Sequence, residues 1–152
     1  AVPLTEQLAA RGFHITVETA GTVDAPLRMD LASISPKLSD STPTEPAAWA
    51  RRHEATRSRP AVVARLVRDH EHQIKFVVGE DTDFGEIEQF IASVEAELGA
   101  PMAPEHILLM PRGRDPDTLN ANLGRAVPEA VARGWRITDR LHVRLFGDTR
   151  GT

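Results

Sequence analysis

Residues 61–78 of the chain, AVVARLVRDHEHQIKFVV, place a helix pattern directly before a strand pattern. The apolar residues of the first half recur at helical spacing and predict one buried face. They are Val62, Val63, Leu66 and Val67. Residues 74–78 are rich in β-branched and aromatic side chains, which is typical of a strand. A helix that leads directly into a strand is one step of the alternation from which parallel sheets are built.

The same alternation continues on both sides of this stretch. We expect strands at residues 14–18, 29–35, 74–78, 106–110 and 141–146. Asp83 can cap a helix that ends at Gly99, and Asp115 or Asp117 opens a last long helix that ends near Gly134. Strands that alternate with helices favour right-handed crossovers, so the sequence predicts a single α/β domain over residues 1–152 with a mostly parallel sheet.

Two stretches do not follow this alternation. Residues 36–60 contain four of the eleven prolines and a polar run at 39–42, which together predict a long loop. Residues 4–9 have apolar side chains at helical spacing before Gly12, so we expect the chain to begin at or inside a helix. Because native proteins seldom begin there, this pattern favours a piece of a longer protein.

The composition excludes several classes of function. The 22 acidic residues outnumber the 18 basic ones, and the basic residues form no stripe, which argues against a nucleic-acid partner. The sequence has neither a membrane-length apolar run nor a signal-peptide pattern at its start, so we expect no membrane partner and a cytoplasmic location. The chain has no cysteine, and it therefore offers no disulfide, no thiolate nucleophile and no thiolate ligand for a metal or a cluster.

Three of the expected strand ends carry groups that can bind a ligand, because ligands of parallel sheets bind beyond the carboxyl ends of the strands. Residues 18–22, ETAGT, offer a carboxylate and hydroxyls; the alternative is a turn whose hydroxyls bind the local backbone. Residues 35–37, SPK, are equally compatible with a clamp for a ribose or a carboxylate and with a strand terminus that ends in a solvated lysine. Residues 110–113, MPRG, can lie against a flat heteroaromatic ring or form an ordinary loop.

The histidines and the common short motifs indicate neither a metal site nor a hydrolase. His70 and His72 are the closest pair, but no third ligand follows at a suitable spacing. His142 lies between two apolar residues on the expected last strand and therefore points to the opposite face, as a surface or hydrogen-bonded histidine does. The chain contains no glycine-rich phosphate loop, GxSxG or HExxH motif, which argues against nucleophilic and hydrolytic enzymes.

Several blocks of the sequence resemble, in order, the back half of the 7-carboxy-7-deazaguanine synthases, which are radical S-adenosylmethionine enzymes. The blocks are HITVETAGTV (14–23), DLASISPKLSDSTP (30–43), QIKFVV (73–78), ILLMPRG (107–113) and RLHVRLFGDTRGT (140–152). The resemblance implies part of a partial (β/α) barrel of the radical S-adenosylmethionine type. It also implies a parent that converts 6-carboxy-5,6,7,8-tetrahydropterin to 7-carboxy-7-deazaguanine with release of ammonia, in queuosine and 7-deazapurine biosynthesis.

The resemblance assigns roles to residues at the strand ends. The residues implied to hold S-adenosylmethionine are Ser35, Pro36 and Lys37 at its ribose and methionine end, and Met110, Pro111, Arg112 and Gly113 beside its adenine. The residues implied to face or close over the pterin substrate are Glu18, Thr19, His142 and Thr152. No catalytic residue and no metal ligand is expected in this chain.

The chain departs from the family in two motifs: it has neither a CxxxCxxC loop nor a GGEP segment. Without thiolates it cannot hold the [4Fe-4S] cluster that the family uses to cleave S-adenosylmethionine, so this chain alone is expected to be inactive. The resemblance implies that the cluster, a magnesium ion, a homodimer partner and a flavodoxin-type reductant belong to the intact parent.

Of two other interpretations, the first remains open. A non-catalytic module that binds S-adenosylmethionine or a nucleoside, and that lost the cluster-binding half, fits the same residues. A flavodoxin-like signalling domain needs an acidic phospho-acceptor cluster at a strand end, and Asp24 and Asp30 do not form one.

Overall fold

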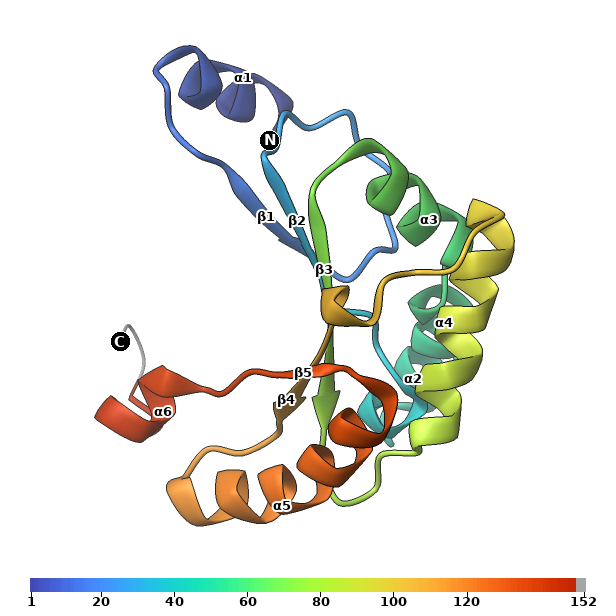
Figure 1. The fold of residues 1–152 in the computed structure, drawn as a ribbon, viewed down its shortest axis with the longest axis vertical. Helices are drawn as coiled ribbons and strands as arrows, with labels where there is room; N and C mark the ends of the chain where they lie inside the picture. Colours follow the sequence, from blue (N-terminus) through green and yellow to red (C-terminus); the bar gives the residue numbers. More distant parts are fainter. Residues whose placement is uncertain (150–152) are drawn as a thin grey trace.

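The computed structural model describes residues 1–149 and contains one five-stranded sheet in which all strands are parallel (Figure 1). The strands are β1 (Thr16–Thr19), β2 (Leu31–Ile34), β3 (His72–Val78), β4 (Ile107–Pro111) and β5 (Arg136–Ile137), and they neighbour one another in that order. β1 and β5 therefore form the two edges. The predicted α/β class with a parallel sheet is confirmed, and the arrangement is consistent with a partial (β/α) barrel.

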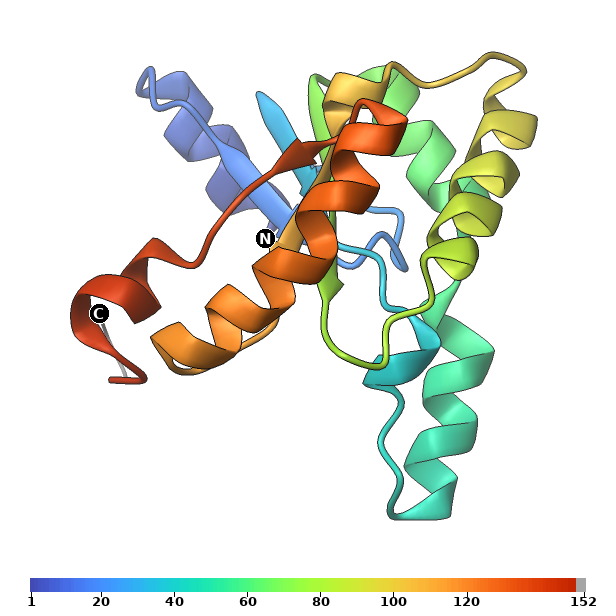
Figure 2. The ribbon, with the colours of Figure 1, turned by 60° about the horizontal axis from the view of Figure 1, so that its bottom comes forward.

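Helices occupy the connections between the strands. They are α1 (Val2–Ala10) before β1, α2 (Ala47–Arg57) and α3 (Pro60–Asp69) between β2 and β3, α4 (Phe84–Leu98) between β3 and β4, α5 (Pro116–Arg133) between β4 and β5, and α6 (Leu141–Phe146) after β5. Short 3-10 turns lie at Ser39–Ser41 and Pro104–His106. Both ribbon views place α3 and α4 on one side of the sheet and α6 on the opposite side (Figures 1 and 2).

The predicted caps delimit the two longest helices. Asp83 accepts a hydrogen bond from the Gly85 amide at 2.8 Å, and Asp115 accepts one from the Thr118 amide at 2.9 Å. Each helix ends at a glycine with positive φ, where a side chain would strain the backbone; the glycine that ends α4 is Gly99. Because the capping hydrogen bond to the Thr118 amide comes from Asp115, this residue and not Asp117 caps the start of α5.

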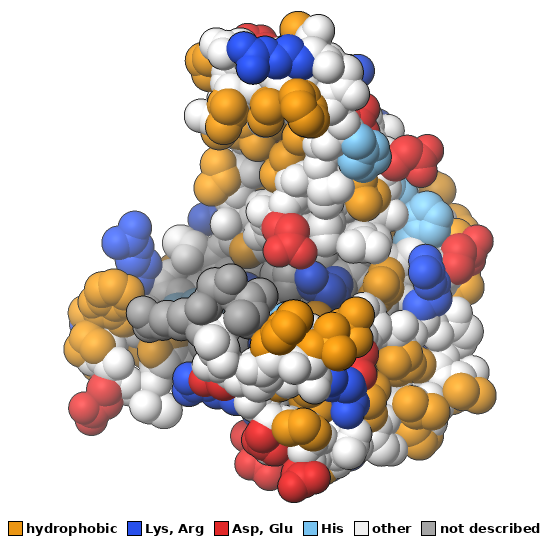
Figure 3. All heavy atoms as spheres, turned by 90° about the vertical axis from the view of Figure 1, so that its left-hand side faces the viewer, with side chains coloured by type: hydrophobic (Ala, Val, Ile, Leu, Met, Phe, Trp, Pro, Cys, Tyr) orange, Lys and Arg blue, Asp and Glu red, His pale blue; other side chains and the backbone are white. Residues whose placement is uncertain are grey.

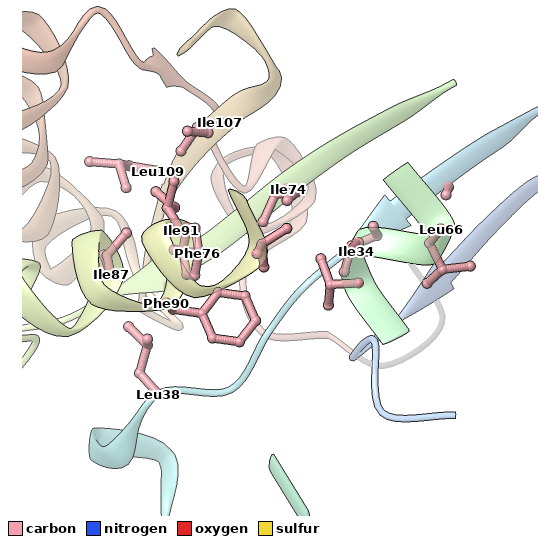
Figure 4. Close-up of a cluster of buried hydrophobic side chains, with 14 of the residues drawn as sticks. Ile34, Leu38, Leu66, Ile74, Phe76, Ile87, Phe90, Ile91, Ile107 and Leu109 are labelled. Atoms are coloured by element: carbon pink, nitrogen blue, oxygen red, sulfur yellow. The ribbon is translucent and has the colours of Figure 1, made fainter. Parts of the chain in front are cut away.

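The hydrophobic core lies between the sheet and helices α3 and α4 (Figure 4). The register places Ile34 beside Ile74 and Ile74 beside Ile107, so isoleucines of three strands form one fully buried row. Phe76 points to the same side and meets Phe90 of α4 edge to face, with the ring centroids 6.0 Å apart. Burial of each such side chain contributes about 1.5–3 kcal/mol, which anchors the strand ends that follow.

The prediction of a strand at 141–146 is wrong, because these residues form α6. The run LHVRLF alternates apolar and polar residues, and six residues are too few to separate a strand period from a helix period. Only Val143 is buried, and the amide of Gly147 bonds to its carbonyl in helical fashion. The place beside β4 is taken instead by β5, a two-residue strand that was not expected.

The expected loop at 36–60 contains an unexpected helix, α2. None of its residues is buried, so the sequence carries no apolar stripe that could have indicated it. The helix follows from its many alanine, arginine and glutamate residues, which favour helices without burial. Arg57 attaches the end of α2 to α4 by an ion pair with Glu86, while the rest of α2 extends away from the sheet (Figure 2).

Candidate functional site

The sheet face opposite the core carries both polar and apolar side chains and forms part of the candidate site. Side chains alternate between the two faces of a strand, so the residues directly before and after each buried isoleucine along its strand point to this second face. Buried Ser33 accepts a hydrogen bond from the Gln73 amide at 3.0 Å, and Lys75 donates to Glu18 at 3.0 Å. Figure 3 shows this side of the molecule hollowed between α1 above and α5 and α6 below.

Three adjoining cavities open on this side and around the carboxyl ends of the strands. The Arg112 cavity, of about 460 Å³, is lined by Pro36, Lys37, Leu38, Asp40, Ser41, His53, Val77, Arg112 and Arg140. The His142 cavity, of about 410 Å³, is lined by Glu18, Gln73, Lys75, Leu108, Met110, Thr138, Asp139, Arg140 and His142. The Thr19 cavity, of about 310 Å³, is lined by Glu18, Thr19, Ala20, Ser35, Lys37, Lys75, Val77, Met110 and Arg140.

Most of the residues singled out from the sequence line these cavities. The lining residues among them are Glu18, Thr19, Ser35, Pro36, Lys37, Met110, Arg112 and His142. His142 lines its cavity from helix α6, not from the expected strand. The roles that the resemblance gave to these residues stay predictions.

Two singled-out residues of the described structure, Pro111 and Gly113, do not line these cavities. Pro111 is fully buried, and Gly113 packs so closely on Leu119 that an added Cβ would lie 3.0 Å from its backbone nitrogen. Thr152 lies outside the described residues. A larger cavity of about 510 Å³ lies elsewhere, between α1, the loop after β1 and α3, and none of the described residues that the resemblance assigned to S-adenosylmethionine or the pterin lines it.

Asp40 organises the loops of the Arg112 cavity. Its side chain is only 7% exposed; it accepts from the Thr82 hydroxyl at 2.6 Å and from Arg112 at 3.3 Å. The Thr82 hydroxyl in turn accepts from the Gly79 amide at 2.9 Å. This chain of contacts ties the loops after β2, β3 and β4 together and holds the Arg112 guanidinium at the cavity.

Helix α2 borders the same cavity through His53. The His53 ring contacts the Thr42 hydroxyl at 2.9 Å, and Thr42 also donates to Glu54. This hydrogen bond, followed by one from Arg57, lowers the pKa of the Glu54 carboxyl. Polar contacts therefore hold His53 in place without apolar packing of α2.

The histidine pair noted in the sequence lies away from these cavities, at the amino ends of β3 and β4. His72 contacts the carbonyl of His70 at 3.1 Å, and its other ring nitrogen lies 2.8 Å from a ring nitrogen of His106. Burial sets the pKa of His72 below its usual value and the charge of His106 lowers it further, while the contact with the His70 carbonyl opposes this shift. Across residues 1–149 no three metal-ligating side chains gather, and no helix is long and apolar enough to cross a membrane.

Comparison with known proteins identifies the relatives of this chain. A 7-carboxy-7-deazaguanine synthase from Halobacterium salinarum is 40% identical over the whole chain, and one from Rhodopirellula baltica is 37% identical over 99% of it. The chain is homologous to 7-carboxy-7-deazaguanine synthases. It spans 62% of the Halobacterium protein and 58% of the Rhodopirellula protein. No family model and no solved structure matched it.

Sequence reasoning missed two residues that the cavities bring forward. Arg140 lines all three cavities, and Asp40 holds Arg112. Asp40 lies in the polar run 39–42, but nothing in the sequence linked that run to the loop after β4. Arg140 is the first residue of the last block of the resemblance, but the resemblance gave roles in that block only to His142 and Thr152.

Proposed function

We propose that this chain is the C-terminal part of a radical S-adenosylmethionine lyase that makes 7-carboxy-7-deazaguanine from 6-carboxy-5,6,7,8-tetrahydropterin and releases ammonia, for queuosine or 7-deazapurine biosynthesis. The observation that carries the proposal is the similarity of the whole chain to named 7-carboxy-7-deazaguanine synthases. The three cavities at the strand ends support it, because two of them join hydroxyls and cations to the flexible thioether of Met110.

The lining residues fit S-adenosylmethionine by their chemistry. Ser35 and Lys37 supply a hydroxyl and an ammonium for the ribose and the methionine carboxylate, and Met110 supplies an apolar contact for the adenine ring. When bound, the cofactor supplies the hydrogen-atom abstraction that starts the ring contraction. The chain's own residues orient the cofactor and the pterin and keep water away from them.

The substrate side of the proposal uses the other lining residues. Glu18 of β1 and His142 of α6 both line the His142 cavity, so the two side chains can bind the same flat, hydrogen-bonding ring. Lys75 holds Glu18 at 3.0 Å and keeps its carboxylate on this face of the sheet. Thr19 adds a hydroxyl from the adjoining cavity.

The residues present do not fit a [4Fe-4S] cluster, because the chain contains no cysteine. We therefore assign the cluster, and with it the magnesium ion, to a part of the enzyme other than this chain. A homodimer, a flavodoxin-type reductant and a cytoplasmic location complete the proposal for the intact enzyme.

The experiment compares this chain with the complete enzyme under anaerobic conditions. We expect iron and sulfide analysis after reconstitution to find a cluster in the complete enzyme and none in this chain. Product should form with the complete enzyme and not with this chain. A stoichiometric [4Fe-4S] signal from this chain would falsify the assignment. The absence of cysteine also fits a non-catalytic module, which predicts that the longest natural form of the protein binds S-adenosylmethionine but neither a cluster nor the pterin.

A further inference from the structure

The charged side chain of Arg140 lies in the middle of the candidate site and has no ion-pair partner in the described part of the chain. It follows β5 and opens α6, and it lines the Arg112, His142 and Thr19 cavities. Its Nε is buried and has no hydrogen-bond partner among residues 1–149. Buried charged donors are nearly always paired, so an unpaired guanidinium that lines a cavity indicates a ligand that completes it.

The nearby carboxylates cannot serve Arg140, because each already has a partner. Asp139, the residue before it, accepts from the Arg140 backbone amide at 2.7 Å and from the side chain of Arg144. The other two carboxylates that line the cavities are engaged as well, Glu18 with Lys75 and Asp40 with Arg112.

The balance of charge in the cavities therefore favours an anion. Lys37 and Arg140 are the lining cations that have no anionic partner in the described part of the chain, and Lys37 shares two of the three cavities with Arg140. The chain as a whole carries a net charge of −4, so this local excess of positive charge is opposite in sign to the net charge of the chain. A guanidinium matches the planar fork of a carboxylate better than an ammonium does.

We infer that Arg140 binds the carboxylate of a ligand at the junction of the three cavities and so selects carboxylated ligands over analogues that lack this group. The inference rests on the proposed function, which supplies two such ligands: S-adenosylmethionine through its methionine end and the pterin through its 6-carboxylate. A site that holds a buried donor for a substrate group rejects the analogue without that group, because the donor is then left unpaired.

The test measures binding to the complete enzyme by titration calorimetry with two matched ligand pairs. S-adenosylmethionine is compared with decarboxylated S-adenosylmethionine, which lacks only the carboxylate, and 6-carboxypterin is compared with pterin. The variants are Arg140→Gln, Arg140→Lys and the control Arg125→Gln, an exposed arginine of α5 that lines none of the cavities. Circular dichroism confirms that each variant is folded.

We expect Arg140→Gln to weaken one carboxylated ligand roughly ten- to a hundred-fold and its partner without the carboxylate by less than about twofold. Arg140→Lys should lose less, and Arg125→Gln should change no affinity. Loss confined to the S-adenosylmethionine pair assigns the carboxylate to the cofactor, and loss confined to the pterin pair assigns it to the substrate.

Two results would overturn the inference while leaving the proposed function intact. One is unchanged affinity for both carboxylated ligands, and the other is equal weakening of a carboxylated ligand and its analogue. If the unmodified enzyme binds neither S-adenosylmethionine nor 6-carboxypterin, the proposed function fails and this assignment fails with it.

Discussion

Replacing Asp40 by alanine should destabilise the fold far more than the same change at Asp81, although both carboxylates face the Arg112 guanidinium. Asp40 is 7% exposed and accepts from Thr82 at 2.6 Å and from Arg112 at 3.3 Å. Asp81 is 73% exposed and lies 3.6 Å from Arg112. A hydrogen bond to a buried charge contributes about 1.5–3 kcal/mol, whereas a half-exposed ion pair adds less than about 1 kcal/mol.

We therefore expect Asp40→Ala to lower the free energy of unfolding by about 2–3 kcal/mol, and Asp81→Ala to lower it by less than about 0.5 kcal/mol. For a chain of this length the Asp40 variant should melt about 5–10 °C below the wild type. Thermal and urea denaturation followed by circular dichroism measures both variants.

A double-mutant cycle tests whether the hydrogen bond from Thr82 is the main contribution. Combined with Thr82→Val, the Asp40→Ala change should show a coupling of at least about 1 kcal/mol, because the two side chains contact each other directly. Equal melting temperatures for Asp40→Ala and Asp81→Ala, or additive effects in the cycle, would refute the buried network as the element that ties these loops together.

Three further predictions follow from other parts of the structure. In the complete enzyme, Lys37→Ala should weaken the binding of S-adenosylmethionine about ten- to a hundred-fold and the binding of the pterin much less, as measured by titration of both ligands. A selective loss of pterin binding would instead assign Lys37 to the substrate site. Gly21→Ala should destabilise the fold by at least about 1 kcal/mol more than Gly12→Ala in urea melts, because both have positive φ but only the Cβ at Gly21 would lie 2.6 Å from Val63. Burial lowers the pKa of His72, so as the pH falls the unfolded chain takes up a proton at this residue before the folded chain does. The contribution of His72 to stability should therefore be complete above the unfolded pKa of about 6.5 and decline as pH falls through the folded value. His72→Gln should reduce this decline between pH 7.5 and 5, and an unchanged slope contradicts the assignment.

The sequence predicted the elements that bury an apolar face and missed those that do not. β2 to β4 and helices α3 to α5 lie where the periodicity placed them, because each contributes buried side chains to one core, and β1 packs its partly buried Val17 against that core. Helix α2 has no buried residue, and both residues of β5 are exposed, so neither leaves an apolar pattern. The run at 141–146 buries Val143 alone, which is too little to distinguish a helix from a strand.

The same reasoning explains how much of the candidate site was predictable. Ser35 and Met110 converge because both stand at the carboxyl ends of parallel strands, and this geometry follows from the alternation alone. The contacts of Asp40 and Arg140 depend on how loops fold back over the sheet. Asp40 and Arg112 are 72 positions apart, and no local pattern encodes a contact at that separation.

The position of β1 at the border of the sheet affects how the isolated chain behaves in solution. A border strand presents a row of amides and carbonyls that can recruit an extended segment of another molecule, and this is a common start of aggregation. The hazard is limited here, because β1 is four residues long and carries the exposed, charged Glu18. Replacing Glu18 with an apolar residue, even for studies of binding, would remove this protection, and the variant should aggregate more readily than the unmodified chain.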